Sequence, residues 1–258
     1  MPFTLIAILI VVGLLGGMLG MQAVGQRLGE EERRLDPDGK RDGANAAEAA
    51  VVALLGLLLA FTFSGAGSRF DARRNLIVDE ANAIGTAWLR IDLLPADRQQ
   101  RVRELFRQYA DARIDTYRAV PDMKAVAAAL RRGEGLQRQI WSTSLEAARE
   151  TGQTPAYTLL LPSLNEMFDI ATTRTAATRM HPPVAIYILL AVLALVASVF
   201  AGYGMSGRRV VSWIHRFGFA LVITVAVYLI VDFEFPRLGL IRVNSMDQLM
   251  VDLRRSMD

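Results

Sequence analysis

The sequence lacks cysteine, which excludes disulfide bonds, thiolate metal sites and cysteine nucleophiles. Its only two histidines, His181 and His215, flank opposite ends of an apolar stretch, so a shared metal site is not expected. Phosphate-binding loops, HExxH sequences and nucleophile elbows are also missing. The adjacent acids Asp79 and Glu80 lie about 100° apart on a helix, and such pairs are too common to indicate acid–base catalysis. We therefore expect no catalytic residue, no metal site and no cofactor.

Strand-like patterns are missing as well, because no stretch of useful length alternates polar and apolar residues. The chain also has little net charge, +3 from 29 basic and 26 acidic residues, which disfavours a nucleic-acid partner. Hydrophobic residues occupy 52% of the 258 positions, and this content indicates a membrane protein that carries a soluble portion. The sequence thus predicts an all-α integral membrane protein.

Four apolar stretches are each long enough to cross about 30 Å of hydrocarbon at about 1.5 Å per residue. They predict four transmembrane helices, with a helical soluble domain between the second and the third. The predicted segments are transmembrane helix 1 at 1–26, a charged connector at 27–44, transmembrane helix 2 at 45–67, the helical soluble domain at 68–182, transmembrane helix 3 at 183–205, transmembrane helix 4 at 209–232 and a C-terminal tail at 233–258. The first stretch lacks a basic n-region, so we favour a span over the alternative of a cleaved secretory signal.

Glycines mark two features of these helices. The first span contains four of them, three or four residues apart, a pattern typical of close helix packing in membranes. These are Gly13, Gly16, Gly17 and Gly20. In the soluble domain, helices are expected at about 97–118, 124–150 and 155–179, the second of them broken or kinked near Gly133 and Gly135. Arginines flank both ends of the spans in nearly equal number, so the positive-inside rule gives no orientation.

The segment from Phe61 to Pro95 leaves the second span, passes a basic cluster and ends at a proline, so it joins membrane to water. Polar residues recur along it at helical spacing. The positions of this stripe are Phe61, Ser64, Ser68, Asp71 or Ala72, Asn75, Asp79, Asn82, Thr86 and Arg90. A polar stripe that begins below the bilayer surface must face other protein or a water-filled path, because lipid cannot satisfy hydroxyl and carboxylate groups. The stripe predicts a permeation or binding surface, and an amphipathic helix with a solvated side is the alternative.

A channel needs a wet lining, a constriction and a charge that selects the ion. Phe61 would be the apolar constriction, and Ser64 and Ser68 would line the pore with hydroxyl groups. An electropositive mouth that favours anions would be formed by Arg69, Arg73 and Arg74. Because one four-helix subunit is too small to enclose a pore, a symmetric ring is implied. In the alternative interpretation, Phe61 packs inside the bundle and the arginines bind phosphates of membrane lipids.

Three stretches carry a family resemblance: FTFSGAGSRFDARRNLIVDEANAIGTAWLRIDLLP at 61–95, the PP before the third span, and DFEFPRLGLIRV at 232–243. Together they resemble the bacterial membrane family labelled bestrophin-like. The resemblance covers nearly the whole chain in order, and EANAIGTAWLRIDLLP is its distinctive block. True bestrophins, which are more remote, are pentameric anion channels with four spans per subunit and a cytosolic helical domain. The resemblance therefore implies a pore lined by the second span and a cytoplasmic middle domain. The chain lacks an obvious acidic calcium-clasp cluster, so calcium gating is not implied.

Within the distinctive block, we expect a polar network between the long helix and its neighbours. Its members would be Asp79, Glu80, Asn82, Thr86 and Arg90. Our hypothesis is a homo-oligomeric, bestrophin-like ion channel, most simply a pentamer, that spans a bacterial inner membrane several times. It would sit among membrane lipids and pass small inorganic anions such as chloride. The alternative is a membrane-anchored sensor or scaffold whose soluble helical domain binds a partner.

Overall fold

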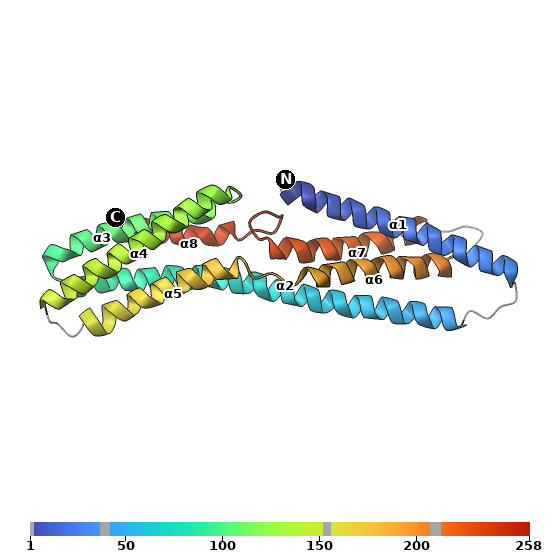
Figure 1. The fold of residues 1–258 in the computed structure, drawn as a ribbon, viewed down its shortest axis with the longest axis horizontal. Helices are drawn as coiled ribbons and strands as arrows, with labels where there is room; N and C mark the ends of the chain where they lie inside the picture. Colours follow the sequence, from blue (N-terminus) through green and yellow to red (C-terminus); the bar gives the residue numbers. More distant parts are fainter. Residues whose placement is uncertain (1–2, 37–41, 152–155, 207–212) are drawn as a thin grey trace. The chain divides into compact units, whose positions relative to one another are not determined.

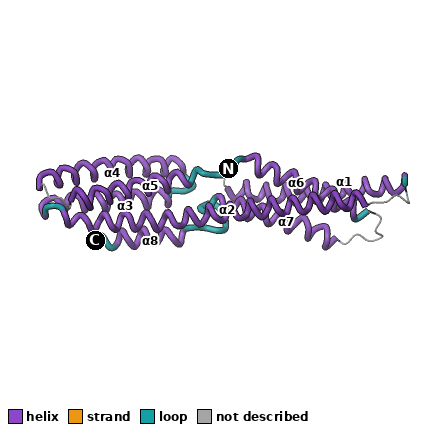
Figure 2. Tube along the Cα trace, turned by 90° about the horizontal axis from the view of Figure 1, so that it is seen from below, coloured by secondary structure: helices purple, strands orange, loops and turns teal. Residues whose placement is uncertain are grey.

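A computed structural model describes residues 3–36, 42–151, 156–206 and 213–258. Every regular element in these residues is a helix, as Figures 1 and 2 show. The elements are α1 (Phe3–Leu35), α2 (Asp42–Arg90), the 3₁₀ helix η1 (Ile91–Leu93), α3 (Ala96–Arg118), α4 (Met123–Thr151), the π-helix η2 (Ala156–Leu160), α5 (Leu161–Ala177), α6 (Val184–Gly204), α7 (Trp213–Glu234) and α8 (Asn244–Arg255). The prediction of an all-α chain is confirmed for the described residues.

The helices form two compact units. One comprises Met1–Arg69 and His181–Phe235, and we call it the apolar unit. The other comprises Phe70–Met180 and Pro236–Asp258, and we call it the charged unit. Helix α2 contributes its first part to the apolar unit and its last part to the charged unit.

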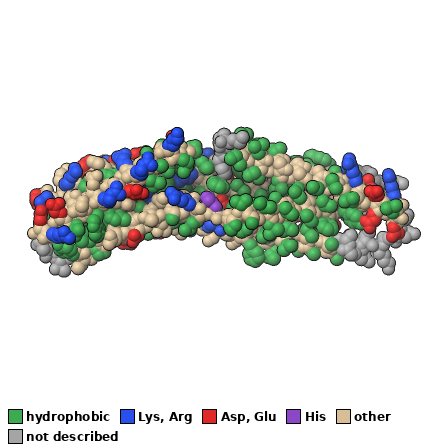
Figure 3. All heavy atoms as spheres, in the orientation of Figure 1, with side chains coloured by type: hydrophobic (Ala, Val, Ile, Leu, Met, Phe, Trp, Pro, Cys, Tyr) green, Lys and Arg blue, Asp and Glu red, His purple; other side chains and the backbone are tan. Residues whose placement is uncertain are grey.

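Four helices among the described residues are long and apolar enough to cross a membrane, and the apolar unit contains α1, α6, α7 and the first part of α2. Its core consists of side chains from α1, α2, α6 and α7, with Met18, Leu55, Leu190 and Ile230 fully or almost fully buried. In each of these helices, only 17–28% of the most apolar 18-residue stretch is buried within the chain. Figure 3 shows hydrophobic side chains over the surface of this unit. Such an apolar surface requires lipid or other protein around it.

Glycine allows α1 and α6 to approach each other closely. A Cβ atom added at Gly25 would lie 1.9 Å from the carbonyl oxygen of Val199, and one added at Gly202 would lie 2.0 Å from that of Gln22. Only glycine fits at both positions, because a real Cβ does not come this close to backbone. Of the four glycines predicted to serve this purpose, Gly17 does contact α6, because an added Cβ would lie 3.2 Å from Cδ2 of Leu195. The other three, Gly13, Gly16 and Gly20, have open space around them.

The charged unit is a helical bundle with its own core. Phe106 and Tyr109 of α3 are completely buried, together with Ile140 of α4 and Met167 of α5. The turn between α3 and α4 is fixed by Asp122, whose carboxylate accepts the backbone N–H of Lys124 at 2.9 Å and of Ala125 at 3.1 Å, as an N-cap does. In Figure 1, α3 and α4 are the green pair of helices.

The sequence predicted either a break or a kink in the middle of α4, and the break is wrong. The helix runs from Met123 to Thr151 and includes Gly133 and Gly135 without interruption. Each glycine lowers the helix-forming tendency by about 1 kcal/mol, but packing of the apolar side of α4 against α3 outweighs that cost.

Candidate functional site

Within the apolar unit, the predicted pore residues lie on the outward side of α2. The side chain of Phe61 is 68% exposed, and Ser64 and Ser68 are exposed as well. The opposite side of the helix carries Leu55 and Ala66, which are buried in the core of the unit. The structure therefore brings Phe61, Ser64 and Ser68 together on one free face of the chain.

The same helical pattern continues within the charged unit. Asn75, Asp79, Asn82 and Thr86 are all exposed. Ile77, Glu80, Ile84 and Ala87, which lie between them in sequence, are buried. The polar stripe recognised in the sequence is thus the outward side of α2 in each unit, apart from Arg90, whose guanidinium donates to the carbonyl oxygen of Leu159 at 2.9 Å.

The three arginines of the predicted mouth have different surroundings. Arg69 pairs with the fully buried carboxylate of Glu234 at 2.5 Å and keeps 34% of its side chain exposed. Arg73 is buried, and it donates to the carbonyl oxygens of Ala177 at 3.1 Å and Met180 at 2.8 Å. Ala177 is the last residue of α5, and Met180 lies just beyond it. A cation there satisfies carbonyls that the helix leaves unpaired. Arg74 remains partly exposed, 3.5 Å from Asp71.

Glu234 also contacts His181, and nothing in the sequence predicted this pair. Nδ1 of His181 lies 3.3 Å from the Glu234 carboxylate, and the imidazole stacks on Phe235 with ring centroids 4.9 Å apart. His181 precedes the two prolines before α6, and Glu234 is the last residue of α7. No spacing in the sequence links the two positions.

Glu80 is the centre of a buried ionic network in the charged unit. Its carboxylate accepts hydrogen bonds from Arg113 of α3 and, at 2.6 Å, from Arg174 of α5. All three side chains are at least nine-tenths buried. Arg113 also donates to the hydroxyl of Tyr117 at 3.0 Å, and Arg174 donates to Asp247 of α8 at 3.1 Å. The network joins α2, α3, α5 and α8.

These contacts set the protonation state of the buried groups. Burial alone raises the pKa of Glu80, but the adjacent Arg113 and Arg174 outweigh that effect and hold its pKa below the ordinary value. Burial likewise acts to lower the pKa of Arg113, and the charge of Glu80 outweighs it, so this pKa is raised. Both groups are therefore charged at neutral pH.

The five residues of the expected polar network have different surroundings in the structure. Glu80 lies inside a network, and Arg90 makes a separate contact with a backbone carbonyl. Asp79, Asn82 and Thr86 are on the exposed face of α2. The partners Arg113, Arg174 and Asp247 were not identified from the sequence, because they come from three helices far apart in the chain. Among the described residues, no group of three or more histidine and acidic side chains is placed to hold a metal ion.

Four long apolar helices make this an integral membrane protein. The family model described as the Bestrophin-like domain matches residues 12–246, and the chain belongs to the bestrophin-like family. A crystal structure of a singly substituted bacterial bestrophin homologue from Klebsiella pneumoniae is similar, with a TM-score of 0.72 at 15% identity over 96% of this chain and 98% of that one. Another structure of the Klebsiella pneumoniae homologue gives a TM-score of 0.69 at 14% identity, over 95% and 98% of the two chains. No curated protein matches the sequence significantly.

Proposed function

We propose that this protein is a homo-oligomeric ion channel whose pore is lined by α2. The observation that carries the proposal is the outward position of Ser64 and Ser68 on a helix of the apolar unit. Hydroxyl groups on that face need polar partners, and lipid has none. A ring of subunits that turn this face of α2 toward a common axis encloses a pore, and the water in that pore solvates the hydroxyl groups.

Phe61 forms the constriction in this arrangement. Its side chain projects from the same face as Ser64 and is 68% exposed within its own chain. Rings of aromatic side chains around an axis make a narrow apolar passage that gates ion flow through its hydration. Membership of the bestrophin-like family supports a pentamer, with the charged unit as a soluble domain on the cytoplasmic side of a bacterial inner membrane.

Anion permeability rests on the basic residues at the end of this face. Arg73 is committed to backbone carbonyls, so Arg69 and Arg74 supply the positive charge that remains partly exposed. Asp71 and Asp79 are exposed on the same side of α2 and oppose it. Of these four residues, Arg69 comes first along α2, so a ring of subunits places positive charge nearest the apolar unit, which favours chloride over potassium at the entrance.

The proposal is tested on the detergent-purified protein by the mass of the complex, followed by chloride and potassium flux into liposomes. We expect a ring of about five subunits and a flux that Phe61→Ala changes severalfold, because that substitution widens the constriction. Val222→Ala on α7 is the matched control, since Val222 is 69% exposed but lies on another helix. A monomer or dimer without flux would support a membrane-anchored sensor or scaffold instead.

A further inference from the structure

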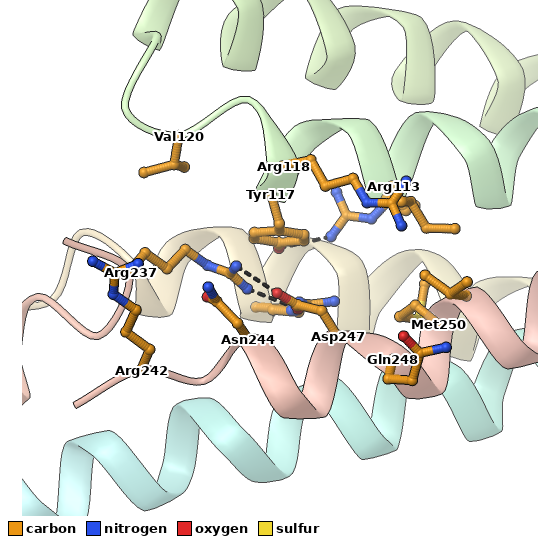
Figure 4. Close-up of a pocket in the computed structure, with 13 residues that line it drawn as sticks. Arg113, Tyr117, Arg118, Val120, Arg237, Arg242, Asn244, Asp247, Gln248 and Met250 are labelled. Carbon is orange, nitrogen blue, oxygen red and sulfur yellow. Dashed lines mark hydrogen bonds and ion pairs between the residues drawn. The ribbon is translucent and has the colours of Figure 1, made fainter. Parts of the chain in front are cut away.

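The charged unit contains a cavity of about 360 Å³ that the proposed pore does not use. Residues of α3, the turn after it, α5, α8 and the segment before α8 line it, and Figure 4 shows their side chains. Five of the lining residues are arginines: Arg113, Arg118, Arg174, Arg237 and Arg242. Asp247 is the one acidic residue that lines the cavity. Such a concentration of one charge in a cavity of this size is unusual for a structural core.

Three of the arginines are held in place by carboxylates. Arg237 makes a bidentate pair with Asp247, at 2.6 and 2.9 Å, which the dashed lines in Figure 4 mark. Arg174 contacts the same carboxylate at 3.1 Å and also binds Glu80, which Arg113 shares. Three guanidinium groups therefore share two carboxylates. Their positions are fixed before any ligand arrives, which lowers the entropic cost of binding.

The other two arginines have guanidinium N–H groups that remain available to donate hydrogen bonds to a ligand. Arg118 makes no ion pair with any residue that the structure describes, and Arg242 uses only its Nε, which donates to the carbonyl oxygen of Gly239 at 2.8 Å. Asn244 and Gln248 add neutral amide groups to the same wall. Together the lining residues and Glu80 carry an excess of three positive charges.

We propose that this cavity binds a small phosphate-bearing anion with two or more negative charges. Guanidinium groups that converge from several elements match the oxygens of a phosphate, which accepts hydrogen bonds in several directions at once. The volume exceeds the space that inorganic phosphate needs, so the ligand carries a further group, either a second phosphate or an organic moiety. The phosphate belongs to a soluble molecule or to a lipid headgroup, and the chemistry of recognition is the same.

The test is the binding of inorganic pyrophosphate to the full-length protein in detergent, measured by titration calorimetry at constant ionic strength. We expect saturable binding of one pyrophosphate per chain. Arg118→Gln combined with Arg242→Gln should raise the Kd about tenfold, because two charge-assisted contacts are lost. Both arginines are exposed, so this double variant folds. The matched control is Arg101→Gln with Arg138→Gln, which removes two exposed arginines outside the cavity and should leave the Kd unchanged.

Absence of saturable binding, or equal weakening in the two double variants, would overturn the proposal. A competition experiment then separates the two sources of phosphate. Displacement of pyrophosphate by vesicles that contain an anionic phospholipid identifies a lipid headgroup as the occupant, and retention identifies a soluble phosphate. These measurements need no ion flux, so their outcome is independent of the proposed channel.

Discussion

At the scale of single residues, the charged unit depends on Glu80. Its carboxylate balances two buried guanidinium groups, and Glu80→Gln leaves both without a counter-charge. Breaking a buried ion pair in this way costs about 3 kcal/mol or more. We expect the midpoint temperature of thermal unfolding to fall by about 6–12 °C in Glu80→Gln. Asp79→Asn is the control, because Asp79 is exposed on the neighbouring position and should change the midpoint little.

The same residue predicts how stability depends on pH. The pKa of Glu80 is lower in the folded protein than in the unfolded chain, so its contribution is fully present above the unfolded pKa. The contribution is lost as the pH falls through the lower, folded pKa. The difference in thermal unfolding between the unmodified protein and Glu80→Gln should therefore be largest above about pH 5 and should shrink as the pH falls below about 4. It should vanish only below the folded pKa of Glu80. A constant difference between the two from pH 7 to pH 3 would contradict this account of Glu80.

At the scale of elements, the contact of α1 with α6 depends on glycine at specific positions. Gly25→Ala places a methyl group against the backbone of Val199 and forces the helices apart, at a cost of about 1–3 kcal/mol. Gly16→Ala on the same helix meets nothing within 4 Å and should be neutral. Thermal unfolding of the two variants in detergent measures the difference, and equal midpoints would show that the close approach does not contribute to stability.

The elements also show which features of the chain can be predicted from sequence. Apolar length is a local property, and it predicted four helices long enough to span a membrane. Polar periodicity picked out one side of α2, and Ser64 on that side is exposed within the chain. Thr86 is exposed as well, although it was expected to join a polar network. Whether a glycine lies at a contact depends on the partner helix, so Gly25 was missed. The ion pairs of Glu80 were missed for the same reason, because each partner comes from a different helix.

At the scale of the whole molecule, the central claim is that the outward side of α2 faces a water-filled pore in an oligomer. Three observations support it: the polar stripe in the sequence, its exposure within a single chain, and membership of the bestrophin-like family. The large apolar surface of the other helices is then left for lipid and for contacts between subunits. In this account the outward side of α2 is in contact with water, whereas the apolar surface is in contact with lipid or another subunit. A water-soluble chemical probe can distinguish the two.

Because the chain contains no cysteine, a single introduced thiol reports on its own position. The decisive measurement is liposomal anion flux through Ser64→Cys before and after a charged, membrane-impermeant thiol reagent, with Val222→Cys on the exposed apolar side of α7 as the control. The account predicts rapid modification and loss of flux for Ser64→Cys, and no effect for Val222→Cys. An unreactive Ser64→Cys, or modification that leaves the flux unchanged, would contradict a pore lined by α2.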